Sequence, residues 1–188
     1  MTTVGPKVSV LMLAYNHEEF IQEAIESVLI QKTNFKYELV IGEDCSTDKT
    51  REVVIEYQKK YPHIIKLNLQ DSNLGGRKNF ISTFSVCEGE YIALLEGDDY
   101  WIDEEKLQKQ VDYLNTNDDC TVCGHSVKMY YEEAKSFLGE MIVKNEKFTL
   151  EDLLIEDIGN KPNKWYLRTL SIMFRKNVLD NPPDIWSK

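Results

Sequence analysis

Apolar and polar positions follow two different periods along the first part of the chain. The segment KVSVLMLAY (7–15) is an apolar run of strand length, and EEFIQEAIESVLIQ (18–31) repeats its apolar residues at helical spacing. The same order returns in YELVIG (37–42) and DKTREVVIEYQKKY (48–61), where Asp48 is placed to cap the helix. Each pair therefore predicts a strand followed by an amphipathic helix.

Further strands and helices follow in the same order. They are the strand IIKLNL (64–69), the turn DSNLGG (71–76), a helix through Phe80, Ile81 and Phe84, the strand EYIALLE (90–96), and the helix EEKLQKQVDYLNT (104–116), which Asp103 opens. Strands that alternate with helices indicate a parallel sheet. We therefore predict an α/β fold class with a mostly parallel central sheet flanked by helices on both faces.

Beyond about Thr121 the pattern loosens and the predicted elements become shorter. They are a strand TVCGHSVKMYY (121–131), a short helix LEDLLIED (150–157), a polar loop GNKPNKWYLR (159–168), a strand TLSIMF (169–174) and the start of a helix at RKNVLD (175–180). No repeat, low-complexity tract or linker divides the chain. We predict a single domain over residues 1–188, in which the later part completes one face of the functional site.

The composition argues against two classes of partner. The 188 residues include 32 acidic and 22 basic side chains, which give a formal net charge of −10. This charge opposes the phosphate neutralisation on which nucleic-acid binding depends. No apolar run approaches the length of a membrane span, and the N-terminus has no signal-peptide pattern. We expect a soluble, cytoplasmic protein that does not bind nucleic acid.

The cysteines do not have the spacing of a disulfide framework. They are Cys45, Cys87, Cys120 and Cys123, and free thiols are the simplest interpretation. The stretch CTVCGH, which ends at His125, has a metal-like spacing, but no second pair of ligands follows it. A zinc or redox site at this stretch is the less favoured alternative.

Polar residues follow directly after three of the predicted strands. AYNHEE (14–19) ends the first strand, GEDCSTD (42–48) the second and EGDDYW (96–101) the fourth. In open α/β sheets ligands bind at the carboxyl ends of the strands, near the point where the strand order reverses. The first turn has no glycine and the chain has no GxxxxGK[ST] segment, so neither a dinucleotide loop nor a P-loop is predicted.

Glu96, Asp98 and Asp99 place three carboxylates at the end of one buried strand. They would repel a diphosphate unless a divalent cation lay between them and the phosphates. Mg²⁺ and Mn²⁺ suit this arrangement, because they bind one or two protein carboxylates together with waters and phosphate oxygens. A metal–diphosphate complex at this edge is therefore the favoured interpretation.

Each of these residues also has a purely structural alternative. Asp98 and Asp99 fit a solvated turn before the helix near Asp103, whose positive end favours acidic groups. Arg77 fits an ordinary surface charge. Helix capping is the corresponding alternative for Asn16, Glu18, Asp44 and Asp48. A functional site is favoured because all these features converge on one edge of the sheet.

Four segments together resemble a known family. KVSVLMLAYNHEEFIQEAIESVLIQ, YELVIGEDCSTDKT, NLGGRKNF and CEGEYIALLEGDDYW are similar, in order and spacing, to the nucleotide-diphospho-sugar glycosyltransferases of family 2, which have the Rossmann-like A-type glycosyltransferase fold. The similarity covers residues 6–115, more than half of the chain. It implies that 6–115 form a nucleotide-sugar-binding half and that 116–188 form part of an acceptor-side half.

The resemblance also implies roles for individual residues. Asp44 is expected to hold the base, usually uracil, Arg77 to add a contact to the nucleotide, and Asp98 to approach the ribose. Asp99 is the expected ligand of Mg²⁺ or Mn²⁺, with Asp98 and Glu96 as the other members of the DxD-type element EGDD. The complete set of implied nucleotide-sugar-binding residues is Ala14, Tyr15, Asn16, Glu18, Asp44, Arg77 and Asp98.

The implied reaction transfers a sugar from a nucleotide-diphospho-sugar, most simply a UDP-sugar, to a hydroxyl of a glycan or lipid-linked acceptor. The resemblance implies inversion, a role in bacterial polysaccharide or glycan synthesis, and a cytoplasmic protein that can lie at the membrane periphery. The family's general base is an Asp in an acidic motif well after the DxD-type element. Asp184 is the last acid of this chain and its surroundings do not match, so the base is expected beyond Lys188.

Two other functions remain open at this stage. A sugar nucleotidyltransferase would need a glycine-rich, basic loop after the first strand, which AYNHEE does not supply. A non-catalytic nucleotide-sugar-binding or interaction module is consistent with the lack of a matched base. Trp101, Trp165 and Tyr166 are candidates for stacking on sugar rings, although packing is the favoured role for them.

Overall fold

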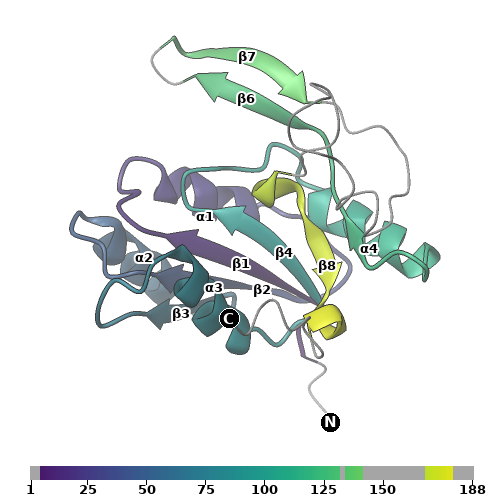
Figure 1. Ribbon diagram of the computed structural model, residues 1–188, viewed down its shortest axis with the longest axis horizontal. Helices are drawn as coiled ribbons and strands as arrows, with labels where there is room; N and C mark the ends of the chain where they lie inside the picture. Colours follow the sequence, from purple (N-terminus) through teal and green to yellow (C-terminus); the bar gives the residue numbers. More distant parts are fainter. Residues whose placement is uncertain (1–4, 132–133, 142–167, 180–188) are drawn as a thin grey trace, which may run out of the picture.

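The computed structural model describes residues 5–131, 134–141 and 168–179 (Figure 1). Its main sheet has six strands in the order β3, β2, β1, β4, β8, β5. The first four strands of this order are parallel, and β8 is antiparallel to both of its neighbours. The predicted α/β fold with a mostly parallel sheet is therefore confirmed. The strands are β1 (Val8–Ala14), β2 (Tyr37–Glu43), β3 (Ile65–Leu69), β4 (Tyr91–Glu96), β5 (Val122–Cys123) and β8 (Met173–Arg175).

Helices cover both faces of the sheet. Successive side chains of a strand point to opposite faces, so one strand contributes to a buried cluster on each face. Val10 and Met12 of β1 belong to the larger buried cluster, which takes in residues of α1 (Ile21–Leu29), α2 (Thr50–Lys60) and α4 (Lys106–Thr116). Leu11 belongs to a second cluster on the other face, against which Phe80 and Phe84 of α3 (Gly76–Ser85) pack. The predicted helix through Phe80, Ile81 and Phe84 is α3, in which Ile81 faces outward and is 54% exposed.

The strand order reverses between β1 and β4. The chain builds β1, β2 and β3 in one direction and then returns through α3 to place β4 on the other side of β1. In register, Leu13 pairs with Glu96 of β4, and Ala14 pairs with Glu43 of β2. The turns after these three strands therefore lie at one edge, which is where the sequence predicts a ligand site.

The later elements differ from the prediction. Residues 121–131 form two short strands, β5 in the main sheet and β6 (Val127–Tyr131), which pairs with β7 (Ser136–Met141) in a separate hairpin that stands away from the main sheet (Figure 1). Thr169–Ser171 and Lys176–Leu179 are 3₁₀ turns on either side of β8. The predicted helix 150–157 and all but the last residue of the predicted loop 159–168 lie outside the described residues. Within the described part of the chain, no helix is long and apolar enough to cross a membrane.

Candidate functional site

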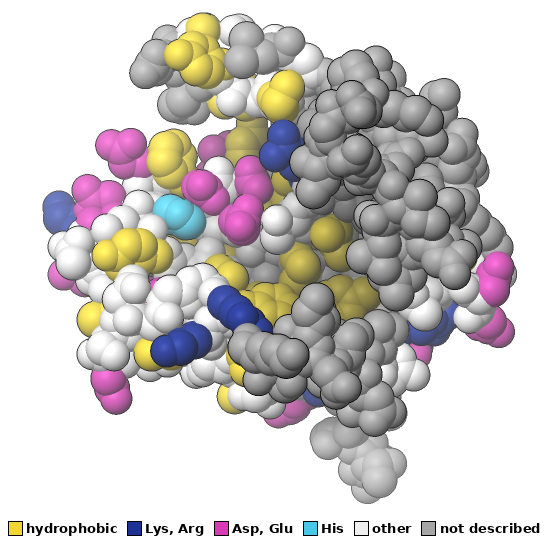
Figure 2. All heavy atoms as spheres, in the orientation of Figure 1, with side chains coloured by type: hydrophobic (Ala, Val, Ile, Leu, Met, Phe, Trp, Pro, Cys, Tyr) yellow, Lys and Arg dark blue, Asp and Glu magenta, His cyan; other side chains and the backbone are white. Residues whose placement is uncertain are grey.

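A group of acidic side chains lies beside a histidine in the hollow below the β6–β7 hairpin (Figure 2). The group forms where β4 ends and the chain turns sharply. The amide of Gly97 donates to the carbonyl of Leu13 at 2.8 Å, and the amide of Asp99 donates to the carbonyl of Glu96 at 3.1 Å. A Cβ atom at position 97 would lie 2.7 Å from Nδ1 of His17, so only glycine fits this close approach.

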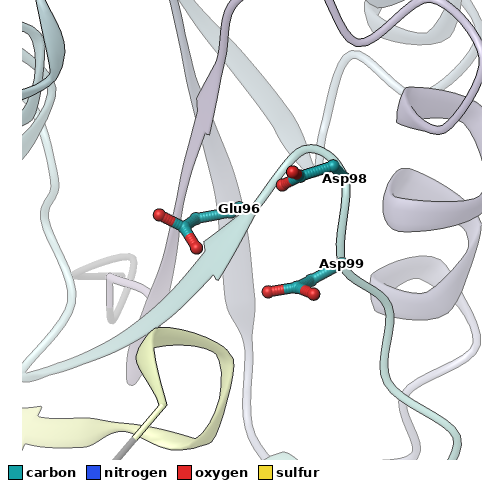
Figure 3. Close-up of side chains that lie close together, drawn as sticks. All are labelled: Glu96, Asp98 and Asp99. Carbon is teal, nitrogen blue, oxygen red and sulfur yellow. The ribbon is translucent and has the colours of Figure 1, made fainter. Parts of the chain in front are cut away.

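Glu96, Asp98 and Asp99 project to the same side of this turn (Figure 3). Each can offer a carboxylate oxygen within 4.8 Å of the oxygens of the other two. Within the described residues this is the only group of three or more His, Cys, Asp or Glu side chains that meets this condition. Its ligands are all carboxylate oxygens, the type that Mg²⁺ and Mn²⁺ prefer.

The electrostatics of the cluster favour a cation. Burial raises the pKa of Glu96, and the negative charges of Asp98 and Asp99 raise it further. Burial and Asp98 also raise the pKa of Asp99, although the nearby Arg168 and His17 act in the opposite direction. Crowded carboxylates of this kind cost folding free energy when all are ionised, and a bound cation would relieve that repulsion.

Several hydrogen bonds tie the turn after β1 to the loop after β2. Asn16 lies in the left-handed region with φ of 56°, where its Oδ1 accepts from the amide of Thr47 at 2.8 Å. Its own amide donates to Oγ of Ser46 at 3.0 Å. Glu18 accepts from the amide of Lys49 at 2.8 Å, and its amide donates to Oδ2 of Asp48 at 3.0 Å. Both side chains therefore have a structural role in the free chain.

The N-cap of α2 is Lys49 rather than the predicted Asp48, and it makes no side-chain cap bond. Asp48 lies one residue earlier, where its Oδ1 accepts from the amide of Thr50 at 2.9 Å. The two nucleotide-site candidates next to this turn differ in exposure. Ala14 is buried with 2% exposed, whereas Tyr15 is 42% exposed at the sheet edge. Tyr15 is thus the member of this pair whose side chain is open to a ligand.

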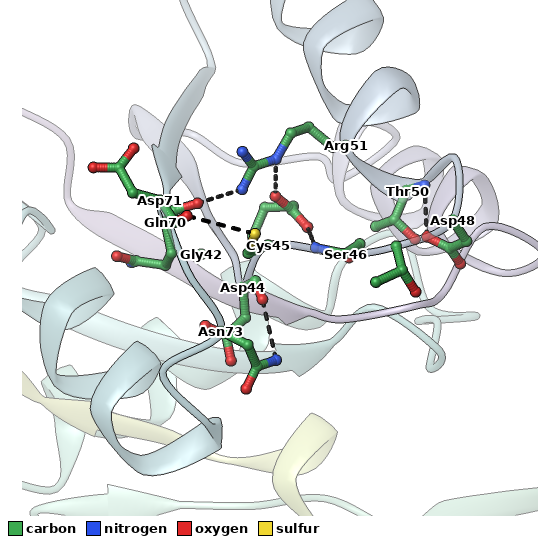
Figure 4. Close-up of polar contacts among 12 residues, drawn as sticks. Gly42, Asp44, Cys45, Ser46, Asp48, Thr50, Arg51, Gln70, Asp71 and Asn73 are labelled. Carbon is green, nitrogen blue, oxygen red and sulfur yellow. Dashed lines mark hydrogen bonds and ion pairs between the residues drawn. The ribbon is translucent and has the colours of Figure 1, made fainter.

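Asp44 is only 3% exposed and holds the turn that precedes α3. Its carboxylate accepts from the amides of Leu74 at 2.7 Å and Gly75 at 2.9 Å, and Nδ2 of Asn73 donates to its carbonyl at 3.2 Å (Figure 4). Gly75 adopts a φ of +78°, which favours glycine. Asp44 therefore fixes the loop from which Arg77 extends, in the first turn of α3.

Sequence reasoning missed the role of Glu43, the acid that precedes Asp44. Glu43 is completely buried, forms an ion pair with Arg51 and accepts from the amide of Ser46 at 2.6 Å (Figure 4). Arg51 also donates to the carbonyl of Gln70 at 2.6 Å. The sequence shows two adjacent acids but not which of them faces inward, so nothing in it singles out Glu43.

A cavity of about 960 Å³ lies next to the acid cluster. The cluster and Arg168 line one part of it, and the start of α4 and the β6–β7 hairpin line the rest. Trp101 also borders it, but only 3% of this side chain is exposed and its Nε1 donates to the carbonyl of Leu170 at 2.8 Å, in line with the packing role. Trp165 and Tyr166 lie outside the described residues.

The alternative zinc site at CTVCGH is not assembled. Cys120, Cys123 and His125 do not form a group of metal ligands, and all four cysteines are free thiols. Two buried cavity residues were also missed, Lys106 and Gln110, which are 4% and 6% exposed. Their spacing of four residues on one helix was visible in the sequence, but a lysine in a helix normally indicates a solvated face.

Comparison with known proteins indicates the family to which this chain belongs. The family model described as Glycosyl transferase family 2 matches residues 9–178. An uncharacterized Mycobacterium tuberculosis protein is 43% identical over 125 residues, which cover 66% of this chain and 36% of that protein. The putative teichuronic acid biosynthesis glycosyltransferase TuaG of Bacillus subtilis is 34% identical over 114 residues, 61% of this chain and 44% of the relative. The chain thus spans less than half the length of either relative.

Two solved structures share the fold. The mannosyltransferase PcManGT from Pyrobaculum calidifontis, in complex with GDP-Man and Mn²⁺, has a TM-score of 0.59 at 22% identity over 68% of this chain and 37% of its own. TarS of S. aureus in complex with UDP-GlcNAc has a TM-score of 0.60 at 22% identity over 93% of this chain and 47% of its own. These similarities support the predicted A-type glycosyltransferase fold.

Proposed function

The chain belongs to glycosyl transferase family 2, and we propose that it binds a nucleotide-diphospho-sugar, most simply a UDP-sugar, together with Mg²⁺ or Mn²⁺. The observation that carries this proposal is the cluster of Glu96, Asp98 and Asp99 at the point where the strand order reverses. In open α/β sheets this point is the usual ligand site. The two solved structures with this fold are complexes with GDP-Man and Mn²⁺ and with UDP-GlcNAc, which supports the same class of ligand.

The three carboxylates fit a divalent cation by chemistry and by position. We propose Asp99 as the main ligand, with Asp98 and Glu96 as the other acidic members of the metal site. A divalent ion bound there would act as a Lewis acid and stabilise the negative charge of the departing nucleoside diphosphate. Arg168, which lies close enough to influence Asp99, adds positive charge on the same side.

The nucleotide would lie along the edge formed by the turns after β1 and β2. We assign Asp44 to the base and Asp98 to the ribose, with Ala14, Tyr15, Asn16, Glu18 and Arg77 around them. Asp44 accepts two amide bonds in the free chain, but an ionised carboxylate has about four acceptor positions, so it can still accept from a base. The hydrogen bonds of Asn16 and Glu18 support the pocket because they hold the two turns together.

The reaction we propose is inverting transfer of the sugar to a hydroxyl of a glycan or lipid-linked acceptor. The cavity beside the acid cluster is large enough for both sugars at about 960 Å³. Deprotonation of the acceptor needs a general base, and we assign this role to no residue of the described cavity. The relative TuaG is a putative teichuronic acid biosynthesis glycosyltransferase, which supports a role in bacterial polysaccharide synthesis. We propose that the protein acts in the cytoplasm or at the membrane periphery.

Metal-dependent binding of UDP tests this function and separates it from that of an interaction module. We expect Mn²⁺ to raise the UDP affinity of the natural chain at least tenfold in calorimetric titrations. Asp99→Asn should remove this gain while the protein stays folded. Glu104→Gln is the matched control, because Glu104 is an exposed acid near the start of α4 that pairs with Lys32. Equal UDP affinity with and without Mn²⁺ in the natural chain would overturn the proposal.

A further inference from the structure

Four buried side-chain polar atoms have no hydrogen-bond partner among the residues that the structure describes. They are Nδ1 of His17, Nζ of Lys106, Oε1 of Gln110 and Nε2 of His125. The last three belong to residues that line the cavity, and His17 lies beside the acid cluster, with Nε2 3.9 Å from Asp98. Buried polar groups in folded proteins are nearly always hydrogen-bonded, so each exception needs an explanation. Their concentration around one cavity points to a ligand.

Lys106 and Gln110 form the central pair of this group. They are one helical turn apart on α4, which places them next to each other on the same face of the helix. Nζ of Lys106 lies 3.7 Å from the centre of the Trp101 ring, a cation–π contact that replaces only part of its lost hydration. The amide nitrogen of Gln110 donates to the carbonyl of Ser171 at 2.8 Å, which leaves Oε1 as its available acceptor.

The neighbours of the pair do not supply the missing bonds. Cys123 lies beside both residues, but a thiol is a weak donor and a weak acceptor. Nδ1 of His125 donates to the carbonyl of Ser126 at 2.8 Å, so this ring is already oriented by the backbone. Burial lowers the pKa of Lys106 well below its ordinary value, which is the expected response of an ammonium group without a counter-ion.

We propose that Lys106 and Gln110 form a subsite for a hydroxyl group of the sugar carried by the nucleotide donor. A hydroxyl accepts one hydrogen bond and donates another, so a single group can satisfy the ammonium of Lys106 and the amide oxygen of Gln110 together. A carboxylate or phosphate cannot donate to Gln110 and would face the acid cluster across the cavity. A cation would be repelled by Lys106.

The position of the pair favours the donor sugar. Trp101, on which Lys106 packs, follows Asp99 by two residues, and the acid cluster lines the same cavity. In a nucleotide-diphospho-sugar the sugar is bonded directly to the diphosphate, so a diphosphate held at the acid cluster through a cation would bring the sugar next to the acids. The subsite rests on the proposed function, which it deepens by assigning residues that recognise the sugar. Lys106 has four rotatable side-chain bonds, so its ammonium can exchange the indole face for a hydroxyl without movement of α4.

Lys106→Met tests the subsite, because methionine keeps most of the stem on Trp101 and removes the charge. Loss of a buried, unpartnered ammonium should leave the thermal stability equal or higher, so the variant should fold. Dissociation constants would be measured with Mn²⁺ for UDP-glucose, UDP-GlcNAc and GDP-mannose, and for UDP and GDP. We expect about tenfold weaker binding of each sugar nucleotide that the natural chain binds, and unchanged binding of UDP or GDP.

Lys109→Met is the matched control, since Lys109 lies on the same helix and lines the same cavity but is exposed and paired with Asp103 and Glu105. It should bind every nucleotide as the natural chain does. Sugar-nucleotide affinities that do not change in Lys106→Met, or that fall in parallel with the affinity for UDP, would overturn the subsite and leave the proposed function intact. Absence of Mn²⁺-dependent nucleotide binding in the natural chain would instead overturn the proposed function, and the subsite with it.

Discussion

The acidic loops after β2 and β4 lie at the same sheet edge but are built in opposite ways. After β2, Glu43 pairs with Arg51, and Asp44 and Asp48 accept backbone amides. After β4, Glu96, Asp98 and Asp99 crowd one another. An acid whose oxygens are used by its own chain stabilises the fold. Burial and neighbouring carboxylates raise the pKa of Glu96 and Asp99, an arrangement that favours a positive ligand.

The largest effect in this comparison is expected for Glu43→Ala. The substitution removes the buried partner of Arg51 and should lower the free energy of unfolding by about 3 kcal/mol. This value is near the low end of the cost of breaking a buried ion pair, because the Arg51 side chain is partly exposed. Asp99→Ala should leave the unfolding free energy unchanged or slightly raised in the absence of divalent cations. Urea denaturation of both variants measures the difference, and equal losses would break the distinction between the two loops.

A smaller effect is expected for Asp44→Ala. Loss of the bonds to the amides of Leu74 and Gly75 should cost about 1.5–3 kcal/mol of stability and loosen the turn before Arg77. If Asp44 also holds the base, UDP affinity per folded molecule should fall and selection among nucleotides should weaken. Titration of UDP, CDP and GDP into the folded variant would check this. Unchanged affinities would restrict Asp44 to its structural role.

The smallest effect is a difference in pH dependence between the loops. Burial alone would raise the pKa of Asp48, but hydrogen bonds from Thr50 and Glu18 lower it below the ordinary value. Asp48 therefore contributes stability at neutral pH that is lost as the pH falls through its lowered pKa. Glu96 and Asp99 have raised pKa values, so their cost is present at neutral pH and is removed as acid protonates them.

Two variants separate these contributions in solutions without divalent cations. Asp48→Asn should be less stable than the natural chain at pH 7, and Glu96→Gln combined with Asp99→Asn should be more stable. Both differences should be on the order of 1 kcal/mol or less, because these groups are partly exposed. Urea unfolding at several pH values should show the difference for the Glu96 and Asp99 variant shrinking as the pH falls toward 4, because both pKa values are raised. The difference for Asp48→Asn should shrink only at lower pH, below the ordinary aspartate pKa of 3.8, because the pKa of Asp48 is lowered. A difference that grows in acid for either variant would contradict the assignment of that loop.

The parts of the site that were predictable depend on local pattern. The position of the acid cluster was predictable because EGDD directly follows a buried strand. The residues that follow such a strand lie at the edge of the sheet. The position of Asp48 beside the start of α2 was predictable for the same local reason, although Lys49 is the N-cap. The exposure of Ile81 was not predictable, since three apolar residues in one helix do not show which of them the sheet covers.

The remaining features depend on contacts between distant segments. The alternation in residues 121–131 was read as one strand, but Val122 pairs with β8, whereas Val127 pairs with β7 in another sheet. Lys106 is buried only because Trp101 and the residues around His125 close over it, which helix periodicity cannot show. Sequence patterns thus located the acid cluster and missed most of the cavity wall.

The β6–β7 hairpin forms the outer wall of the cavity and is a separate sheet from the main one. It pairs with no strand of the six-stranded sheet, yet Met129, Tyr130 and Phe137 line the cavity. Tyr130 and Phe137 meet edge to face with ring centres 5.2 Å apart, and Phe137 is 56% exposed. Substitutions at these positions would change the outer wall without disturbing the main sheet core. The shape and polarity of the outer cavity wall can therefore change between related chains while the acid cluster and the main sheet stay the same.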